Sequence, residues 1–238
     1  MFKKLKVKQE VYLKIDGTYF KRWGCVLTYK AGKKIIFTSF TIRENYLSYL
    51  TDLIKIIQLG YEIKGVTSDG VKCLDSAIKT LFDDKQNPIP HQRCLVHLQR
   101  DSQTFLTQRP ETQAGVKLLE IVKQINNIEN HYEKEIWIKW FERFEERNKE
   151  VLNQRSKGIH PKTGKLTWWY THKNLRRTYR MIRNSLPNLF LYLDYPKLPK
   201  DTNGLEGEFS HLKRKLSLHR GLKRARKINL AKWYFNLK

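Results

Sequence analysis

Three acidic residues occupy sequence settings that suit metal-dependent chemistry on phosphate groups. Asp16 follows an apolar extended run, Asp69 follows a short apolar stretch, and Glu206 stands at the start of a helical pattern. Carboxylate oxygens are ligands that Mg²⁺ prefers, and Mn²⁺ can substitute for it. Two such ions can activate a water or a 3′-hydroxyl and stabilise the leaving oxygen of a phosphodiester. We therefore expect two metal ions, with Asp16 bridging both and Asp69 and Glu206 each holding mainly one.

Each carboxylate also has a structural alternative that the sequence alone leaves open. Asp16 and Gly17 can form a hairpin turn, because Asp-Gly pairs favour such turns. Asp69 can be the N-cap of the helix that follows it. Asn203 and Glu206 have the spacing of a capping box, in which two side chains satisfy backbone N–H groups at a helix start.

The first hundred residues alternate extended and helical patterns, as an α/β domain requires. The expected strands are residues 11–20, 23–29 and 34–40, all antiparallel, then 62–67 and a short strand near 91–94. The expected helices are residues 43–59, with Gly60 as the stop, and 71–82. Asp69 then follows the carboxyl end of a strand, where open α/β sheets bind their ligands.

A long segment separates Asp69 from Glu206 and indicates a mainly α-helical insertion, because apolar residues recur in it at helical spacing. We expect residues 1–100 to form the first part of a catalytic domain and residues 101–200 to form the insertion. Residues 201–238 then supply the last catalytic helix and a basic C-terminal region.

The composition predicts a polyanionic partner. The chain has 47 Lys and Arg against 23 Asp and Glu, a formal net charge of +24, and residues 151–193 and 209–238 contain no acid. Such segments suit a DNA backbone, although any single cluster can also be an exposed helix face. Tryptophans beside cations suit stacking on unpaired bases, with core packing as the alternative. The residues expected to contact DNA are Trp168, Trp169, Arg176, Arg177, Arg180, His211, Lys213 and Arg214.

The order and spacing of these motifs resemble a known family. The motifs are, in chain order, Asp16, Asp69, a Cys-x-x-His element from Cys94 to His97, and an Asn-x-x-Glu element from Asn203 to Glu206. Together they look like the Mutator-like group of DDE transposases, which includes bacterial insertion-sequence enzymes. The resemblance implies a ribonuclease H-like mixed sheet with a helical insertion before the last catalytic helix.

The same resemblance implies DNA strand cleavage and strand transfer in transposition, by a cut-and-paste or a copy-and-paste route. Transposon ends and target DNA are the implied partners, and a homodimer on DNA is a further expectation. Cys94, His97 and Asn203 are expected near the active site. Zinc binding by Cys94 and His97 stays an open alternative, because their spacing suits a metal but no second pair completes four ligands.

The remaining features concern cellular context. No apolar run approaches the roughly 20 residues that cross a membrane, and three scattered cysteines fit a reducing compartment. We expect a cytoplasmic, nucleoid-associated protein. The first expected catalytic strand begins close to residue 1, which leaves no room before it for an N-terminal DNA-recognition region. Three alternatives stay open: a fragment, a truncated element product, or an enzyme that recognises the element's ends with a separate segment. Two other interpretations stay open: an inactive basic DNA-binding remnant, and a ribonuclease H-like nuclease without strand transfer.

Overall fold

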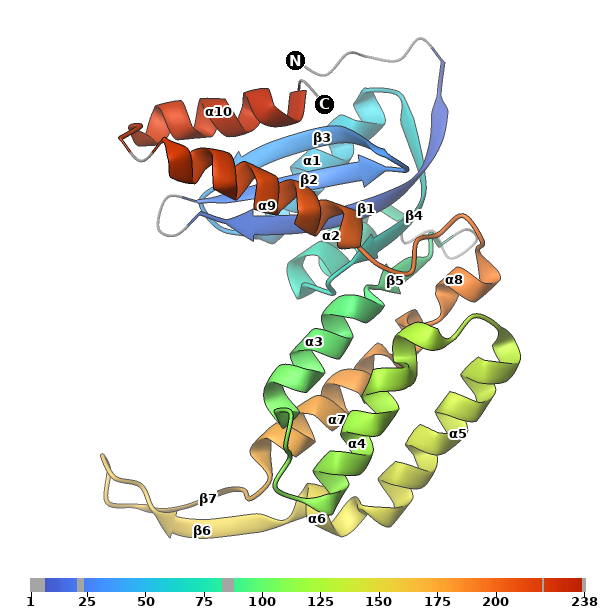
Figure 1. The fold of residues 1–238 in the computed structure, drawn as a ribbon, viewed down its shortest axis with the longest axis vertical. Helices are drawn as coiled ribbons and strands as arrows, with labels where there is room; N and C mark the ends of the chain where they lie inside the picture. The colour runs from blue at the N-terminus through green and yellow to red at the C-terminus, as the bar shows by residue number, and fades with distance from the viewer. Residues whose placement is uncertain (1–6, 21–23, 83–87, 220, 237–238) are drawn as a thin grey trace. The chain divides into compact units, whose positions relative to one another are not determined.

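The structure, a computed structural model, describes residues 7–20, 24–82, 88–219 and 221–236. Within them, five strands form a mixed sheet in the order β3-β2-β1-β4-β5 (Figure 1). The strands are β1 (Gln9–Tyr19), β2 (Cys25–Ala31), β3 (Lys34–Thr41), β4 (Tyr61–Ser68) and β5 (His91–Arg93). The first three are antiparallel neighbours, β4 is parallel to β1, and β5 is parallel to β4. The α/β class with a mixed sheet is confirmed, and the predicted strand start at residue 23 lies outside the described residues.

Helices cover both faces of this sheet, and the alternation of side chains along β2 reflects it. Leu27 and Tyr29 join the core on the side of α1 and α2. Val26, the residue before Leu27, packs with Leu205 and Phe209 on the other face. The covering helices are α1 (Tyr46–Gln58), α2 (Lys72–Phe82), α9 (Asn203–Leu218) and α10 (Arg224–Asn236). The sheet is therefore the middle of three layers, as Figure 1 shows.

Local sequence sets both ends of α1. The side chain of Asn45 accepts the N–H of Ser48 at 2.9 Å, which satisfies one free donor of the first turn. The helix therefore begins at Tyr46 rather than at residue 43. Gly60 adopts a φ of 98°, a left-handed conformation that glycine adopts at low cost, and its N–H donates to the Ile57 carbonyl at 2.9 Å. The predicted stop at Gly60 is confirmed.

The chain divides into two compact units, which we call the sheet unit (Met1–Cys94 and Asp194–Lys238) and the helical unit (Leu95–Leu193). The helices from α3 onward are α3 (Leu95–Leu106), α4 (Gln113–Gln124), η2 (Ile125–Asn127), α5 (His131–Arg147), α6 (Lys149–Asn153), α7 (Lys173–Ser185), η3 (Leu186–Asn188) and α8 (Leu191–Asp194). Trp137 lies in the core of the helical unit. Its ring stacks on Phe141 with centroids 5.7 Å apart, and its Nε1–H donates to the Ile121 carbonyl at 2.9 Å.

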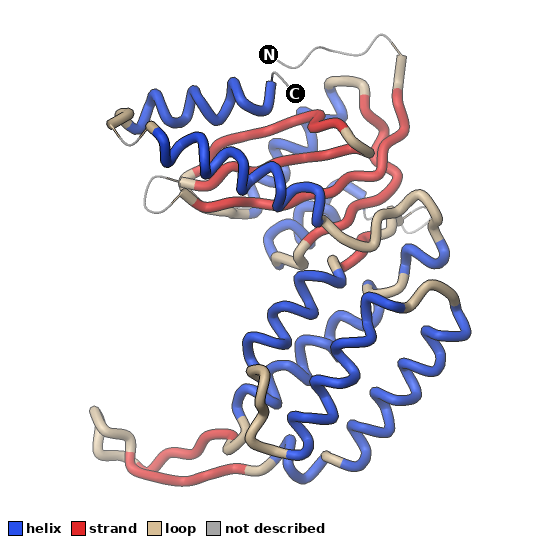
Figure 2. The backbone as a smooth tube through the Cα atoms, viewed as in Figure 1, coloured by secondary structure: helices blue, strands red, loops and turns tan. Residues whose placement is uncertain are grey.

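A two-stranded antiparallel hairpin, β6 (Arg155–Ile159) and β7 (Leu166–Tyr170), separates α6 from α7 (Figure 2). The prediction of a mainly helical insertion over residues 101–200 did not include this hairpin, because strands of five residues with Gly158 and several cations carry a weak pattern. The available signals are the aromatic run of β7 and Gly164, which has a φ of 64° in the connecting loop. Among the described residues, no helix is both long and apolar enough to cross a membrane.

Candidate active site

Asp16 and Asp69 lie at the same level of two neighbouring parallel strand segments. The register between β1 and β4 pairs Ile15 with Ser68, so the next residue of each segment is one of the two aspartates. Adjacent strands are about 4.8 Å apart, and the register thus brings two residues distant in sequence together. Asp16 is 7% exposed and lies inside β1, which continues to Tyr19. The hairpin-turn alternative for Asp16 is therefore wrong.

The loop that carries Asp69 has a well-defined backbone. Asp69 Oδ1 accepts the N–H of Val71 at 3.2 Å, and α2 begins only at Lys72. Gly70 has a φ of 78°, and a Cβ atom at this position would collide with the Arg93 guanidinium. Asp69 is therefore not the N-cap of α2. It holds a turn at the carboxyl end of β4, the edge where α/β sheets bind ligands.

A chain of polar side chains supports the same loop. Ser68 Oγ lies 2.8 Å from His91 Nε2 and accepts the N–H of Gly70 at 3.2 Å. His91 Nδ1 lies 3.4 Å from Asp75 Oδ1. The Ser68 hydroxyl can accept a second hydrogen bond or donate one, so its contact with His91 Nε2 ties β4 to β5 in either tautomer of the ring. The proximity of His91, together with Lys79 at 2.8 Å, lowers the pKa of Asp75.

Cys94 fixes the start of α9, the helix that carries Glu206. The buried Cys94 sulfur accepts two hydrogen bonds from Thr202, from the N–H at 3.3 Å and from the hydroxyl at 3.4 Å. Thr202 is the N-cap of α9 but makes no side-chain cap hydrogen bond, because its hydroxyl points to the sulfur. Asn203 is the first helical residue and is exposed. The capping-box alternative for Asn203 and Glu206 is therefore wrong.

Two lysines tie the same end of α9 to the sheet. Lys14 of β1 forms an ion pair with Asp201, with 3.6 Å between Nζ and Oδ1. Lys30 of β2 is buried and donates to the Gly204 carbonyl at 3.2 Å. The first turn of α9 is therefore anchored to two neighbouring strands of the sheet.

Side-chain alternation puts Asp16 on the face of the sheet that α9 covers. Ile15 belongs to the core on the α1 side, so Asp16 points to the opposite face. Its partner across the β1–β2 pair is Thr28, two residues from Lys30, which contacts the start of α9. Glu206 is half-buried in the first turn of α9. Asp16 and Glu206 therefore stand on the same side of the sheet.

The donor chemistry of these carboxylates fits Mg²⁺ or Mn²⁺, which take oxygen ligands. Within the part of the chain that the structure describes, no three His, Cys, Asp or Glu side chains converge closely enough to hold a metal ion. The described His, Cys, Asp and Glu side chains therefore form no complete metal site by themselves. This holds for the three carboxylates and for possible zinc ligands around Cys94. Thr28 Oγ1, opposite Asp16 in the register, is a buried hydroxyl that has no hydrogen-bond partner among the described residues. This face therefore keeps an unused polar atom beside Asp16.

A fourth acidic residue at this end of the sheet, Glu44, has no predicted role. Its carboxylate accepts hydrogen bonds from Tyr49 Oη at 3.0 Å and Cys25 Sγ at 3.4 Å, and a Cβ atom on Gly17 would collide with it. Burial raises the pKa of Glu44, the two hydrogen bonds oppose this rise, and the charge of Asp69 adds to it. An acid just before a helix is common, so the sequence carries no signal for this position.

Lys213 of α9 brings a positive charge toward the Asp16 end of the sheet. Burial is the main cause that raises the pKa of the Cys25 thiol; the charge of Asp16 adds to the rise and Lys213 opposes it. Both charges therefore act on one sulfur atom. His211 and Arg214 are exposed on the same helix. As DNA contacts, all three stay predictions.

The predicted DNA contacts on α7 have different surroundings. Arg176 Nη1 donates to two oxygens of α6, including Asn153 Oδ1 at 2.8 Å. The Arg176 guanidinium thus makes hydrogen bonds within the helical unit, between α7 and α6. Arg177 lies 3.9 Å from the ring centroid of Phe105, and both Arg177 and Arg180 are exposed. Of the three predicted contacts on α7, Arg177 and Arg180 are therefore the exposed ones.

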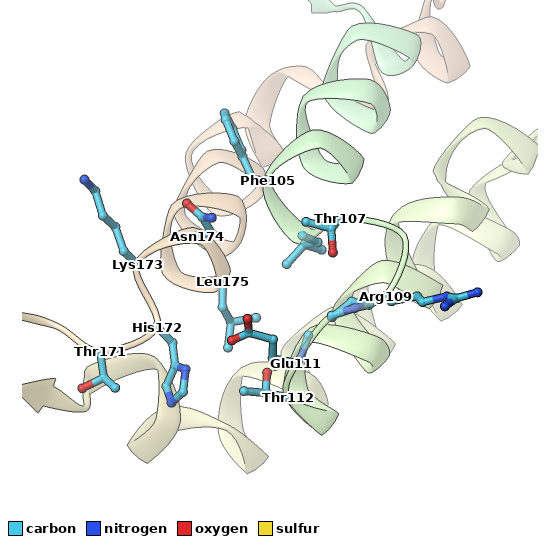
Figure 3. A pocket seen from close by; sticks show the side chains of 13 residues that line it. Phe105, Thr107, Arg109, Glu111, Thr112, Thr171, His172, Lys173, Asn174 and Leu175 are labelled. Atoms are coloured by element: carbon cyan, nitrogen blue, oxygen red, sulfur yellow. Dashed lines mark hydrogen bonds between the residues drawn. The ribbon is translucent and has the colours of Figure 1, made fainter.

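A cavity of about 350 Å³ opens in the helical unit between the end of α3 and the start of α7 (Figure 3). Its lining carries charges of both signs, from Arg109, Glu111 and Lys173. Thr107 at its edge has a φ of 64°, uncommon for a residue with a Cβ atom. His97 lies in the first turn of α3 and does not line this cavity, nor does any of the three carboxylates. The cavity is therefore separate from the candidate catalytic residues.

An α/β sheet with acidic residues on two central strand segments, covered by a basic helix that adds a third, is an arrangement expected of a transposase. Comparison with family models supports this class: residues 66–227 match the model of the IS66 transposase family. The match covers more than half of the chain, and the chain belongs to the IS66 transposase family. It is thus a transposase, an enzyme of a family that acts on DNA, and DNA is its partner.

The family match corrects one expectation. IS66 transposases are insertion-sequence enzymes, but they are a different family from the Mutator-like group, so the Mutator-like resemblance is wrong. Elements of four residues, such as those at Cys94 and Asn203, are too short to distinguish one transposase family from another. The matched residues include Asp69 and Glu206 but not Asp16. No curated protein matches the chain.

Proposed function

We propose that the chain is a DDE transposase core in which Asp16, Asp69 and Glu206 bind two Mg²⁺ ions for DNA strand cleavage and strand transfer. The observation that carries this proposal is the register of β1 and β4, which aligns the two aspartates beside the face that α9 covers. The strand order, three antiparallel strands followed by two parallel ones, supports a ribonuclease H-like fold. The basic segments supply a surface for the DNA backbone.

Bound metal ions would supply activation of the attacking oxygen and stabilisation of the leaving oxygen. The chain's own contribution is positioning. β1 holds Asp16 with little exposure, the turn to Val71 holds Asp69, and the Cys94–Thr202 contact fixes the helix start that carries Glu206. Three like charges repel one another, so we expect these side chains to converge only when cations bind.

The test is Mn²⁺-dependent nicking and joining of DNA that carries the element's ends. Asp16→Asn, Asp69→Asn and Glu206→Gln should each lower the rate by about 10³-fold or more, since each removes several kcal/mol of charge stabilisation. Glu208→Gln is the matched control on the same helix. Glu208 accepts a hydrogen bond from Tyr234 Oη at 3.2 Å, which a glutamine oxygen can also accept, so its activity should stay near that of the original chain.

DNA binding without metal should remain in all four variants, which separates loss of chemistry from loss of folding. A carboxylate variant that still cleaves at the original rate removes that residue from the proposed site. Tight DNA binding by the original chain with no metal-dependent product favours an inactive remnant. Cleavage without joining favours a nuclease.

A further inference from the structure

The β6–β7 hairpin exposes large apolar side chains and has no core of its own. Trp168 and Trp169 are 49% and 48% exposed, and Ile159 and Leu166 are exposed as well. A two-stranded sheet standing alone is marginally stable in water. Figure 1 shows the two strands projecting from the end of the helical unit. Exposed aromatic and apolar side chains on such an arm indicate a surface that meets a partner.

Contacts at both ends hold the hairpin in one shape. At its base, the Thr171 N–H donates to the Gln154 carbonyl at 3.0 Å, and the Ser156 and Thr171 hydroxyls lie 2.8 Å apart. At its tip, the Gly164 N–H donates to the His160 carbonyl at 2.9 Å. The arm is therefore arranged before a partner binds, which lowers the entropy cost of binding.

One face of the hairpin is a ladder of cations and aromatic rings. The register pairs Arg155 with Tyr170 and Lys157 with Trp168. The Arg155 guanidinium lies 4.2 Å from the ring centroid of Trp168, and Trp168 meets Tyr170 edge-to-face at 5.4 Å. The ring of Trp168 is thus already engaged on this face.

Trp169 lies on the opposite face of the hairpin, and the surroundings of its ring differ from those of Trp168. Trp169 lies diagonally across from Gly158, where a Cβ atom would stand 2.7 Å from Trp169 Cη2. The absence of a side chain at Gly158 therefore lets the indole lie across the neighbouring strand. In the described part of the chain, no cation and no aromatic ring stacks on Trp169. Trp169 is the ring left available for stacking.

Charge identifies the partner as an anion. Residues 155–170 contain four cations and no acid; the cations are Arg155, Lys157, Lys162 and Lys165. A ribbon that reads a duplex groove presents hydrogen-bonding side chains to the base edges. Here indole and aliphatic groups occupy much of the outward surface instead. Such a combination suits an unpaired strand, on which aromatic rings stack on bases and cations follow the phosphates.

We propose that the β6–β7 hairpin is a binding arm for unpaired DNA, with Trp169 stacking on a base and Arg155 and Lys157 contacting phosphates. The proposal rests on the proposed function for the nature of the substrate, DNA, and does not depend on the three carboxylates.

The test measures binding of the full chain, without divalent metal, to a labelled single strand of about 20 nucleotides and to the duplex of the same sequence. Trp169→Ala should weaken single-strand binding by about tenfold, which corresponds to about 1.4 kcal/mol, and leave duplex binding unchanged. Trp169→Phe should restore most of the loss, because it keeps an aromatic face. Trp140→Ala, which removes a 39% exposed indole on the acid-containing helix α5, is the matched control and should bind as the original chain does.

Lys157→Ala should weaken binding and reduce the dependence of log K on log salt by about 0.7 for the single strand. Equal binding by Trp169→Ala and the original chain overturns the proposal, and so does an equal loss on single strand and duplex. If Trp169→Ala instead changes the sedimentation of the free protein and leaves DNA binding intact, the arm binds a second copy of the chain. Because the readout involves no cleavage, the failure of this proposal and that of the metal site are distinguishable.

Discussion

The candidate active site and the β6–β7 hairpin hold their polar groups in opposite ways. In the sheet unit, Asp16 lies inside a central strand, and Cys94 and Lys30 anchor the helix that carries Glu206. In the hairpin, cations lie over exposed aromatic rings and no core supports either face. The difference matches the demands on each region: metal ligands must be carried by elements that a core holds in place, whereas stacking and phosphate contacts need exposed side chains.

The largest predicted effect is the difference in stability loss between alanine substitutions of two tryptophans, one in the core of the helical unit and one on the hairpin. Trp137 is 2% exposed and stacks on Phe141, so Trp137→Ala should lower the free energy of unfolding by about 4 kcal/mol through loss of packing. Trp169→Ala on the exposed hairpin should change it by less than about 0.5 kcal/mol. Urea unfolding of both variants measures the contrast. Similar losses would mean that the hairpin is part of the core.

A smaller effect should appear at the sulfur that anchors α9. Cys94→Ala removes the acceptor of two hydrogen bonds from the buried residue Thr202, and should cost about 2 kcal/mol of stability. Cys94→Ser keeps an acceptor at the same place and should lose less. Urea unfolding gives the stabilities, and Mn²⁺ titration of DNA cleavage reports the position of Glu206. Identical behaviour of the two variants would contradict the anchoring role.

The smallest effect concerns the polar chain behind Asp69. His91 and Lys79 lower the pKa of Asp75 in the folded protein, so the unfolded chain binds a proton more readily. The resulting stabilisation is present above the unfolded pKa of about 3.9 and is lost as the pH falls below it. Asp75→Asn should therefore flatten the fall in unfolding free energy between about pH 5 and pH 3, by less than about 1 kcal/mol because the group is partly exposed. Urea unfolding across this range measures the slope, and an unchanged slope would contradict the assignment.

Sequence patterns predicted those elements whose signal is local. The strand around Asp16, the stop of α1 at Gly60 and the helix after Thr202 all depend on periodicity or on single turn residues, which act through neighbours in the chain. The hairpin was missed because its strands are short and rich in glycine and cations. Glu44 was missed because its relevance comes from contact with Gly17 and Cys25, and no local rule encodes that proximity.

By itself, the sequence determined the α/β class, the helical character of the insertion, the basic segments and the acidic residues worth considering. Only the tertiary structure decided the register that aligns Asp16 with Asp69, the use of Cys94 as an anchor for α9, and the different surroundings of Trp168 and Trp169. The physical reason is the range of the interactions. Propensity and periodicity act within a few residues, whereas register, buried hydrogen bonds and ring contacts form between segments that meet only in the folded chain.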